Sequence, residues 1–386
     1  MLIKTYLYSN INNTTMKSGV LKSSWTLVGS IVGAGIIGLP FVMQKAGFLT
    51  GILVMIIICL LMTLINLYLA EIVTSTKEKH QLTGYAEKYL GKKGKWIMFI
   101  ANISSLYGAL VAYIIGAGYA ISAIFPGESF FYSIIFFVFV SIIIYFGINI
   151  ISNVEYIFSP IKLVVALLLG ISLLSVIKSS NILVFDIENI LIPYGVIVFG
   201  FTGVSAIPLM NEELKNKNNL IKSIIWGMVI SFIIYFIFSL GVVGALGNNV
   251  NEVATVSLKE FGSFVNIIAN LFALLAMGTA FLALGFALKE NFLLDIKLKN
   301  RTAWFATITI PLIIFVTGIT GFIKILEFTG AIAIAIILIL IILMHNKINK
   351  LRNRIPEFHM PQSLLLKGVI VIILLGGIFY ELISLL

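Results

Sequence analysis

The chain has 386 residues, of which 60% are hydrophobic and 11% are charged, and its mean hydropathy is +1.10. Soluble domains carry about 25% charged residues, so a soluble enzyme or binding module is excluded, as are disordered and collagen-like chains. The net charge of +10 would indicate nucleic acid in a soluble domain, but in so apolar a chain it reports membrane topology first. A single cysteine, Cys59, excludes an internal disulfide and a cysteine metal cluster, and three histidines (His80, His345 and His359) are too few and too scattered for a histidine metal site.

Eleven stretches are apolar over about the 20 residues that a membrane-crossing helix needs. They lie near residues 23–43, 47–75, 96–124, 129–149, 155–177, 190–210, 223–246, 262–288, 302–322, 325–345 and 368–386. The predicted fold class is therefore an all-α integral membrane protein with eleven transmembrane helices. Because the segment before the first span is polar, we expect no removable signal peptide. No loop is long enough for a soluble domain, so any function resides in the helix bundle.

The basic residues predict the orientation. With the N-terminus placed in the cytosol, five cytosolic segments hold 21 of the 26 lysines and arginines. This skew predicts a cytosolic N-terminus and, with an odd number of spans, an outside C-terminus.

The first and sixth predicted spans are both interrupted by glycines, and in each span a proline ends the glycine-rich break. Residues 29–40 read GSIVGAGIIGLP and residues 198–208 read VFGFTGVSAIP, so that a shift of 168 places Gly35 on Gly203 and Pro40 on Pro208. The two spans cross the membrane in opposite directions, which indicates an inverted repeat. We therefore divide the chain into a cytosolic N-terminal segment (1–22), a first repeat of five spans (23–177), a second repeat of five (190–345), a cytosolic loop (346–367) and an eleventh span (368–386).

Each break exposes backbone groups that can bind a ligand, because glycine and proline weaken a helix and unwound backbone persists in a membrane only where it is buried or lines a cavity. A half-helix that starts near Ile36 directs amides and a positive dipole end at an anion such as a carboxylate. The carbonyls around Phe199–Phe201 attract an ammonium, so a zwitterion fits between the breaks. The alternative is close helix packing, since Gly29 and Gly33 form a small-xxx-small pair. A phosphate loop is not expected, because no Gly-Lys-Ser/Thr follows the glycines.

Four motifs in order give the chain a family resemblance. They are GAGIIGLP (33–40), YIIGAG (113–118), the stretch 199–208 that runs into NEELK (211–215), and GTAFLALG (278–285). The sequence resembles the amino acid–polyamine–organocation superfamily of secondary transporters over most of its length, and within it the amino acid/auxin permease and aromatic amino acid permease groups. The resemblance implies the leucine-transporter fold, with helices 1 and 6 broken, and alternating access around a midplane site between helices 1, 3, 6 and 8.

The resemblance also implies which residues meet the substrate. By position, the carboxylate would meet Gly33, Ala34 and Gly35, and the amine and side chain would meet Phe199, Gly200, Phe201 and Thr202. A third-helix tyrosine often helps to bind the carboxylate in related transporters, and both Tyr107 and Tyr113 are candidates. They lie six residues apart and face different directions on a helix, so we expect only one to take part. The alternative for each is core packing or an interfacial anchor.

The same resemblance suggests where a coupling ion would bind. Sodium-coupled members hold Na⁺ with first-helix carbonyls and eighth-helix hydroxyls, and the matching positions are Gly29, Val32, Ala276, Thr279 and Ala280. Thr279 retains a hydroxyl, but Ala280 stands where a serine is common. One oxygen ligand fewer weakens a sodium site.

Lys162 bears on the same question, because a charge inside a membrane helix is costly and is a functional hypothesis by default. It follows Pro160 in the fifth predicted span. In some proton-coupled relatives, a lysine on this helix places its ammonium where sodium would sit, and its protonation replaces ion binding. The alternative is that Lys162 snorkels to the cytosolic headgroups. We expect H⁺ as the coupling ion, with Na⁺ as the alternative, and no other cofactor, metal or catalytic residue.

The expected function is secondary transport of neutral amino acids, large or aromatic, because Phe199 and Phe201 are apolar and no acidic residue lies near either break. A Na⁺ symporter or an exchanger is the nearest alternative, and a channel or a transporter-like receptor is more distant. A membrane enzyme would need a catalytic constellation, and none is visible. The expected partners are the amino acid and the lipid bilayer of a prokaryotic plasma membrane, without nucleic acid or an obligatory protein partner. Among the few membrane carboxylates, Glu71 is the one expected to join a cytosolic gate network.

Overall fold

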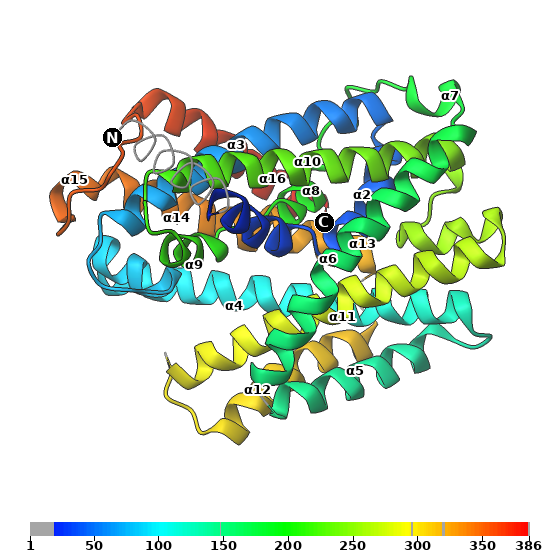
Figure 1. The fold of residues 1–386 in the computed structure, drawn as a ribbon, viewed down its shortest axis with the longest axis horizontal. Helices are drawn as coiled ribbons and strands as arrows, with labels where there is room; N and C mark the ends of the chain where they lie inside the picture. Colours follow the sequence, from blue (N-terminus) through cyan, green and yellow to red (C-terminus); the bar gives the residue numbers. More distant parts are fainter. Residues whose placement is uncertain (1–18, 147, 295, 319–320, 385–386) are drawn as a thin grey trace, which may run out of the picture.

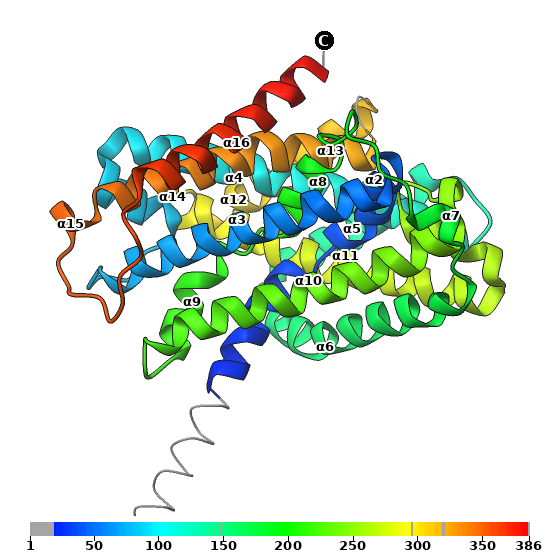
Figure 2. The ribbon, with the colours of Figure 1, turned by 90° about the horizontal axis from the view of Figure 1, so that it is seen from above.

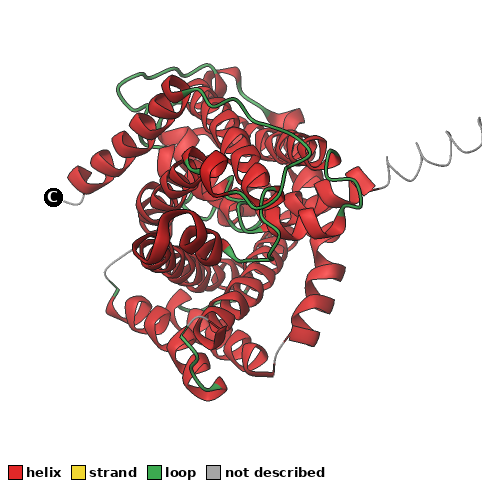
Figure 3. Cartoon of the chain, turned by 90° about the vertical axis from the view of Figure 1, so that its left-hand side faces the viewer, coloured by secondary structure: helices red, strands yellow, loops and turns green. Residues whose placement is uncertain are grey.

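The computed structural model describes residues 19–146, 148–294, 296–318 and 321–384, and within these ranges the chain forms helices and loops but no strand (Figure 3). The long helices are α3 (Phe48–Thr74), α4 (Leu82–Ile124), α5 (Ser129–Phe146), α6 (Ile148–Leu173), α10 (Asn219–Leu246), α11 (Ser263–Leu294), α12 (Asn300–Thr317) and α16 (Leu364–Ser384). Of these, α3, α4, α10 and α11 lie roughly along the long axis of the molecule, whereas α6 is steeply inclined to it (Figure 1). Most of the predicted N-terminal segment lies outside the described residues.

Two of the predicted spans are each built from two shorter helices. The first consists of a half-helix, Gly19–Ile31, and α2 (Gly35–Lys45), which are bent by 63° at the break. The sixth consists of α8 (Tyr194–Gly200) and α9 (Ala206–Glu213). The glycine pattern of the sequence therefore predicted both interruptions correctly, and the structure begins α2 one residue before the expected start at Ile36.

A third irregular span contains α13 (Phe322–Phe328), the π-helical segment η4 (Thr329–Ile334) and α14 (Ala335–Asn346). The segment η4 packs against α8, and Gly195 of α8 meets Gly330 of η4 with no room for a side chain between the backbones. The remaining elements are short: η1 (Leu174–Val176), α7 (Ser179–Ile182), η2 (Gly247–Asn249), η3 (Ala254–Phe261) and α15 (Ile348–Leu351).

Eight of the described helices are long and apolar enough to cross a membrane, and the bent pair Gly19–Ile31 and Gly35–Lys45 makes a ninth span. The other two predicted spans correspond to α6 and to the interrupted pair α8 and α9, which fall short of that criterion. The count of eleven therefore stays a prediction. The helices pack into one bundle in which α10 lies against α6 and α16 lies against α14, on opposite sides in Figure 2.

Candidate functional site

The two helix breaks touch each other inside the bundle. A Cβ atom built on Gly35 would lie 2.8 Å from the Cα of Gly200, so the backbones meet in direct contact. Gly35 is the first residue of α2 and Gly200 is the last residue of α8. The amino end of one half-helix therefore faces the carboxyl end of another, which is the arrangement that the zwitterion argument requires.

The backbone groups at this junction carry partial charges of both signs. No side chain caps the amino end of α2, whose N-cap residue is Ala34. The first amides of a helix have no partner within it, and they form a positive dipole end suited to an anion. The half-helix that ends at Ile31 and helix α8 both direct their last carbonyls, the negative ends, toward the same region.

A tyrosine that the sequence analysis missed lies between these carbonyls. The hydroxyl of Tyr235, on α10, lies 2.7 Å from the carbonyl oxygen of Ile31 and 2.8 Å from that of Gly200. Its side chain is fully buried. In the sequence, Tyr235 is one aromatic residue among many in an apolar span, so no local signal distinguishes it.

The predicted substrate residues cluster around the junction. Ala34 and Phe201 are fully buried, and the Phe201 ring packs edge to face on Tyr235 with 5.0 Å between centroids. Phe199 is half-buried. The Thr202 hydroxyl, two residues past the end of α8, donates to the carbonyl of Val198 in that helix at 2.7 Å.

The structure separates the two candidate tyrosines of the third span. The Tyr107 hydroxyl donates to the carbonyl of Ala306 on α12 at 2.8 Å, so Tyr107 points away from the breaks. Tyr113 is buried in the core. A role of Tyr113 at the carboxylate therefore stays a prediction of the resemblance.

The first and eighth predicted spans meet at positions that were expected to hold an ion. A Cβ on Gly33 would lie 3.8 Å from the Cβ of Ala280 on α11, while Val32 and Ala276 are buried nearby in the core. The Thr279 hydroxyl donates to the carbonyl of Leu275 at 2.8 Å, within its own helix. A Cβ atom built on Gly29 would have no described neighbouring atom within 4 Å.

Lys162 lies on the buried side of α6. Its exposed fraction is 3%, whereas its neighbours Ile161 and Val164 are 43% and 55% exposed. Helix α6 packs against α10 and α11, so this side of the helix faces the bundle. Such burial does not fit the alternative in which the ammonium reaches the headgroups.

Comparison with known proteins identifies the family. A profile of the tryptophan/tyrosine permease family matches residues 16–384. The chain belongs to this family. It is 27% identical over 330 residues to "Glutamine transporter 2" of Aliivibrio fischeri, covering 81% of this chain and 84% of that one.

Two further relatives of the permease carry names of aromatic substrates. It is 25% identical to "Low affinity tryptophan permease" of Proteus vulgaris, covering 84% of this chain and 86% of that protein. It is 27% identical to "Tyrosine-specific transport system 1" of Haemophilus influenzae, covering 69% and 71%. The crystal structure of MhsT in complex with L-phenylalanine superimposes with a TM-score of 0.67 and 16% identity over 94% of this chain and 98% of that one, which confirms the leucine-transporter fold.

At the predicted cytosolic end of the permease, Glu71 joins three parts of the chain. Its buried carboxylate lies 2.7 Å from Nε2 of His345 on α14, 3.1 Å from Nδ1 of His359, and 2.9 Å from the backbone amide of Met360, which donates to it. Beside it, the Lys367 ammonium donates to the side chains of Asn346 and Gln362, each at 2.7 Å. Two histidines that are 274 and 288 residues from Glu71 in the sequence thus meet its carboxylate, which ties the loop after α15 to α3 and α14.

Polar bonds also join the half-helices to their surroundings on both sides of the junction. At the predicted cytosolic end, the Thr26 hydroxyl donates to Glu213 of α9 at 2.9 Å, and Lys79 pairs with Glu212 at 2.7 Å. At the opposite end, the Gln44 side chain of α2 donates to Asn248 at 2.7 Å. The two half-helices of the predicted cytosolic side are therefore tied to one another.

Two surface hollows of the permease lie at the loops. One of about 430 Å³ is lined by residues of the α3–α4 loop, of α9 and of the α9–α10 loop, together with Arg354. In this region, hydrogen bonds from the Asn353 amide and the Lys88 ammonium lower the pKa of Glu78 to about 2, and burial lowers the pKa of Lys217.

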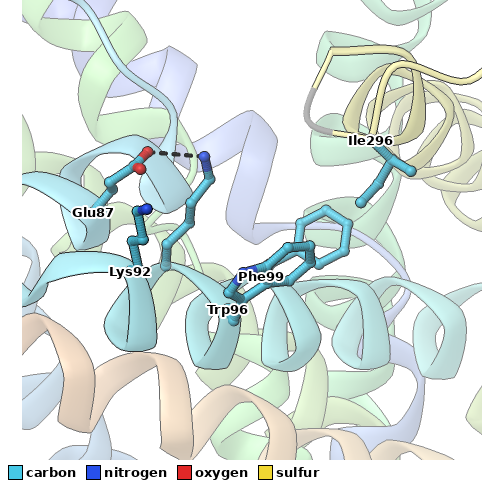
Figure 4. A pocket seen from close by; sticks show the side chains of 6 residues that line it. Glu87, Lys92, Trp96, Phe99 and Ile296 are labelled. Atoms are coloured by element: carbon cyan, nitrogen blue, oxygen red, sulfur yellow. Dashed lines mark ion pairs between the residues drawn. The ribbon is translucent and has the colours of Figure 1, made fainter.

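The second hollow, of about 280 Å³, is charged at one end and apolar at the other. Figure 4 shows Trp96 and Phe99 of α4 next to Ile296, while Glu87 pairs with Lys95 at 2.8 Å at the other end. None of the residues lining either hollow belongs to the helix breaks.

Proposed function

We propose that this permease carries neutral amino acids with large or aromatic side chains by alternating access around the junction of Gly35 and Gly200. The observation that carries the proposal is the contact between the amino end of α2 and the carboxyl end of α8. The uncapped amides of α2 suit the carboxylate of an amino acid, and the carbonyls at the end of α8 suit its ammonium.

The side chains around the junction favour a neutral, apolar substrate. Phe199 and Phe201 flank the end of α8, and no acidic residue occurs in segments 31–36 and 199–205 to pair with a cationic side chain. The names of the two aromatic permeases among the relatives agree with this choice. The name of the glutamine transporter makes glutamine the polar substrate to test beside them.

We infer further that protons drive the transport and that Lys162 carries the coupling charge. The support is the near-complete burial of Lys162 on a helix that packs against α10 and α11. A buried lysine changes its protonation state readily, and the Ala280 position provides no hydroxyl for a sodium ion. The predicted orientation, with the N-terminus in the cytosol, belongs to the same proposal and rests on 21 of 26 basic residues lying in the loops of one side.

Uptake by proteoliposomes tests the proposal. Purified permease is reconstituted, and uptake of labelled tryptophan, tyrosine, phenylalanine, glutamine and lysine is measured under an inward pH gradient, an inward Na⁺ gradient, or neither. We expect saturable uptake of the aromatic amino acids, driven by the pH gradient. Uptake driven by Na⁺ alone would refute proton coupling, accumulation of lysine in preference to the aromatic amino acids would refute the substrate class, and uptake that does not saturate would indicate a channel.

A further inference from the structure

The hydroxyl of Tyr235 occupies the point where two half-helices end. Its oxygen lies 2.7 Å from the carbonyl oxygen of Ile31, the last residue of the half-helix that begins at Gly19, and 2.8 Å from that of Gly200, the last residue of α8. The last carbonyls of a helix lack partners within it and form its negative dipole end. Beyond the end of its half-helix, the Ile31 carbonyl also accepts from the Gly33 amide at 2.8 Å. Two such ends would repel each other without a donor between them.

A tyrosine supplies that donor and is held in place to do so. Its ring reaches from α10 and packs edge to face on Phe201, with an angle of 69° between the planes. A Cβ on Gly200 would lie 3.5 Å from Cε2 of Tyr235, so the ring also contacts the end of α8 directly. The Tyr235 side chain is fully buried, and Ile31 and Gly200 are also buried, so the three groups meet inside the bundle.

A phenol has only one proton to donate, and both of its partners are carbonyl oxygens that can only accept. The hydroxyl therefore bonds to one carbonyl at a time or shares its proton between the two. If the half-helix Gly19–Ile31 moves away, the proton can stay with Gly200, and if α8 moves, it can stay with Ile31. The same group can thus release either half-helix while holding the other.

We propose that Tyr235 is a positioning residue of the transport cycle, whose hydroxyl tethers the two broken helices and transfers its hydrogen bond between them as they separate. This inference rests on the proposed transport function for its role in the cycle, but the tether itself does not depend on which substrate is carried. It assigns a mechanical role to α10, a helix outside the set that the family resemblance named.

The test compares Tyr235→Phe with Tyr194→Phe. Tyr194, on α8, is also buried, but its hydroxyl has no hydrogen-bond partner among the described residues. Each substitution removes one buried hydroxyl, and only the first removes a donor to the breaks. In Tyr235→Phe, the Gly200 carbonyl loses this donor, whereas the Ile31 carbonyl keeps the Gly33 amide. A buried carbonyl without a donor costs enough to change an equilibrium by about tenfold or more.

Two measurements are made on wild type and both variants. In proteoliposomes, we expect the maximal uptake rate of Tyr235→Phe to fall about tenfold or more, with the half-saturating substrate concentration changed far less, and Tyr194→Phe to behave as wild type. In lipid nanodiscs without substrate, hydrogen exchange of segments 27–35 and 198–204 should be faster in Tyr235→Phe alone.

The two measurements separate the tether from the function. Unchanged exchange in Tyr235→Phe, or equal effects of the two substitutions, would overturn the inference. If the wild-type protein transports no amino acid, the proposed function fails, while faster exchange in Tyr235→Phe alone still supports the tether.

Discussion

The contact between Gly35 and Gly200 gives a prediction whose size follows from the structure. In Gly35→Ala, the added Cβ would lie 2.8 Å from the Cα and 3.5 Å from the nitrogen of Gly200. The nearer atom belongs to the backbone, so the two helix ends must move apart. Overpacking of this kind costs about 1–3 kcal/mol, and the higher helix propensity of alanine offsets at most about 1 kcal/mol.

Because the clash is with backbone, we take the upper part of this cost, about 2–3 kcal/mol; less an offset of about 1 kcal/mol, it leaves about 1–2 kcal/mol. This corresponds to a factor of about 5–30 in an equilibrium between the compact and the separated arrangement. We therefore expect Gly35→Ala to lower the uptake rate about tenfold and to lower the apparent melting temperature in detergent. Gly200→Ala is the informative comparison, because its Cβ would meet the ring of Tyr235 at an ordinary 3.5 Å. Its melting temperature should stay close to that of wild type.

The control for alanine substitution in a membrane helix is Gly376→Ala on α16, where no atom lies within 4 Å of the added Cβ. Uptake assays and thermal unfolding are measured on all three variants at equal amounts of reconstituted protein. If Gly35→Ala matches wild type in both assays, the two helix ends are not in the contact described. Equal loss of stability in Gly35→Ala and Gly200→Ala would also refute the reasoning, since it depends on the direction of each Cβ.

Three other substitutions test separate parts of the molecule. Lys162→Met should leave the protein folded but abolish the response of uptake to a pH gradient, and an unaltered response would remove Lys162 from the coupling mechanism. Glu71→Gln should destabilise the fold by about 1–3 kcal/mol and speed proteolysis of segment 352–363, because the Glu71 carboxylate is buried. The exposed Glu357 pairs with Arg354, so Glu357→Gln should change stability by less than about 1 kcal/mol. Equal effects of the two substitutions would contradict this difference in burial. Asn353→Ala removes the main cause that lowers the pKa of Glu78 from 4.5 to about 2. A lowered carboxyl pKa stabilises the fold above about pH 4.5, and this stabilisation is lost as the pH falls toward 2. Wild type should therefore melt at a higher temperature than the variant at pH 6, and the difference should shrink with acidification; a difference independent of pH would refute the assignment.

The helix breaks were predictable because their causes are local in the sequence. Glycine and proline act on the backbone within a few residues of themselves, so the sequence alone places the interruptions within one or two residues of Gly35 and Gly200. The fold class followed from the same kind of information, since the apolar stretches and the loop charges are also local patterns.

The partners of buried polar groups were not predictable, because they come from distant parts of the chain. The Tyr235 hydroxyl and the carbonyl of Ile31 are 204 residues apart, and Glu71 and His345 are 274 residues apart. The sequence marked Glu71 as the carboxylate expected to join a cytosolic gate network, and it judged the three histidines only as too few and too scattered for a metal site. Packing of α3 against α14 brings Glu71 and His345 together, and no periodicity within either helix encodes that.

Packing also decided questions that the sequence left open. The sequence did not distinguish Tyr107 from Tyr113. In the structure, the Tyr107 hydroxyl donates to the carbonyl of Ala306, so Tyr107 points toward α12. From its position in the fifth predicted span, the Lys162 side chain was long enough to reach the lipid headgroups. The side of α6 on which it lies, however, faces the bundle. In both cases, the deciding fact is which neighbouring helix a side chain meets.

The junction combines these two kinds of information. Helix α8 ends at Gly200 and helix α2 starts at Gly35. Tyr235, which is distant in the sequence, donates to the carbonyl of Gly200. A carbonyl oxygen has two lone pairs, so Tyr235 does not exhaust the acceptor capacity of Gly200. Under the proposed function, the substrate ammonium can bind the second lone pair while its carboxylate meets the amides of α2. The amino acid would then add a bond across the same contact that the tyrosine holds, and its arrival would strengthen the junction rather than compete for it.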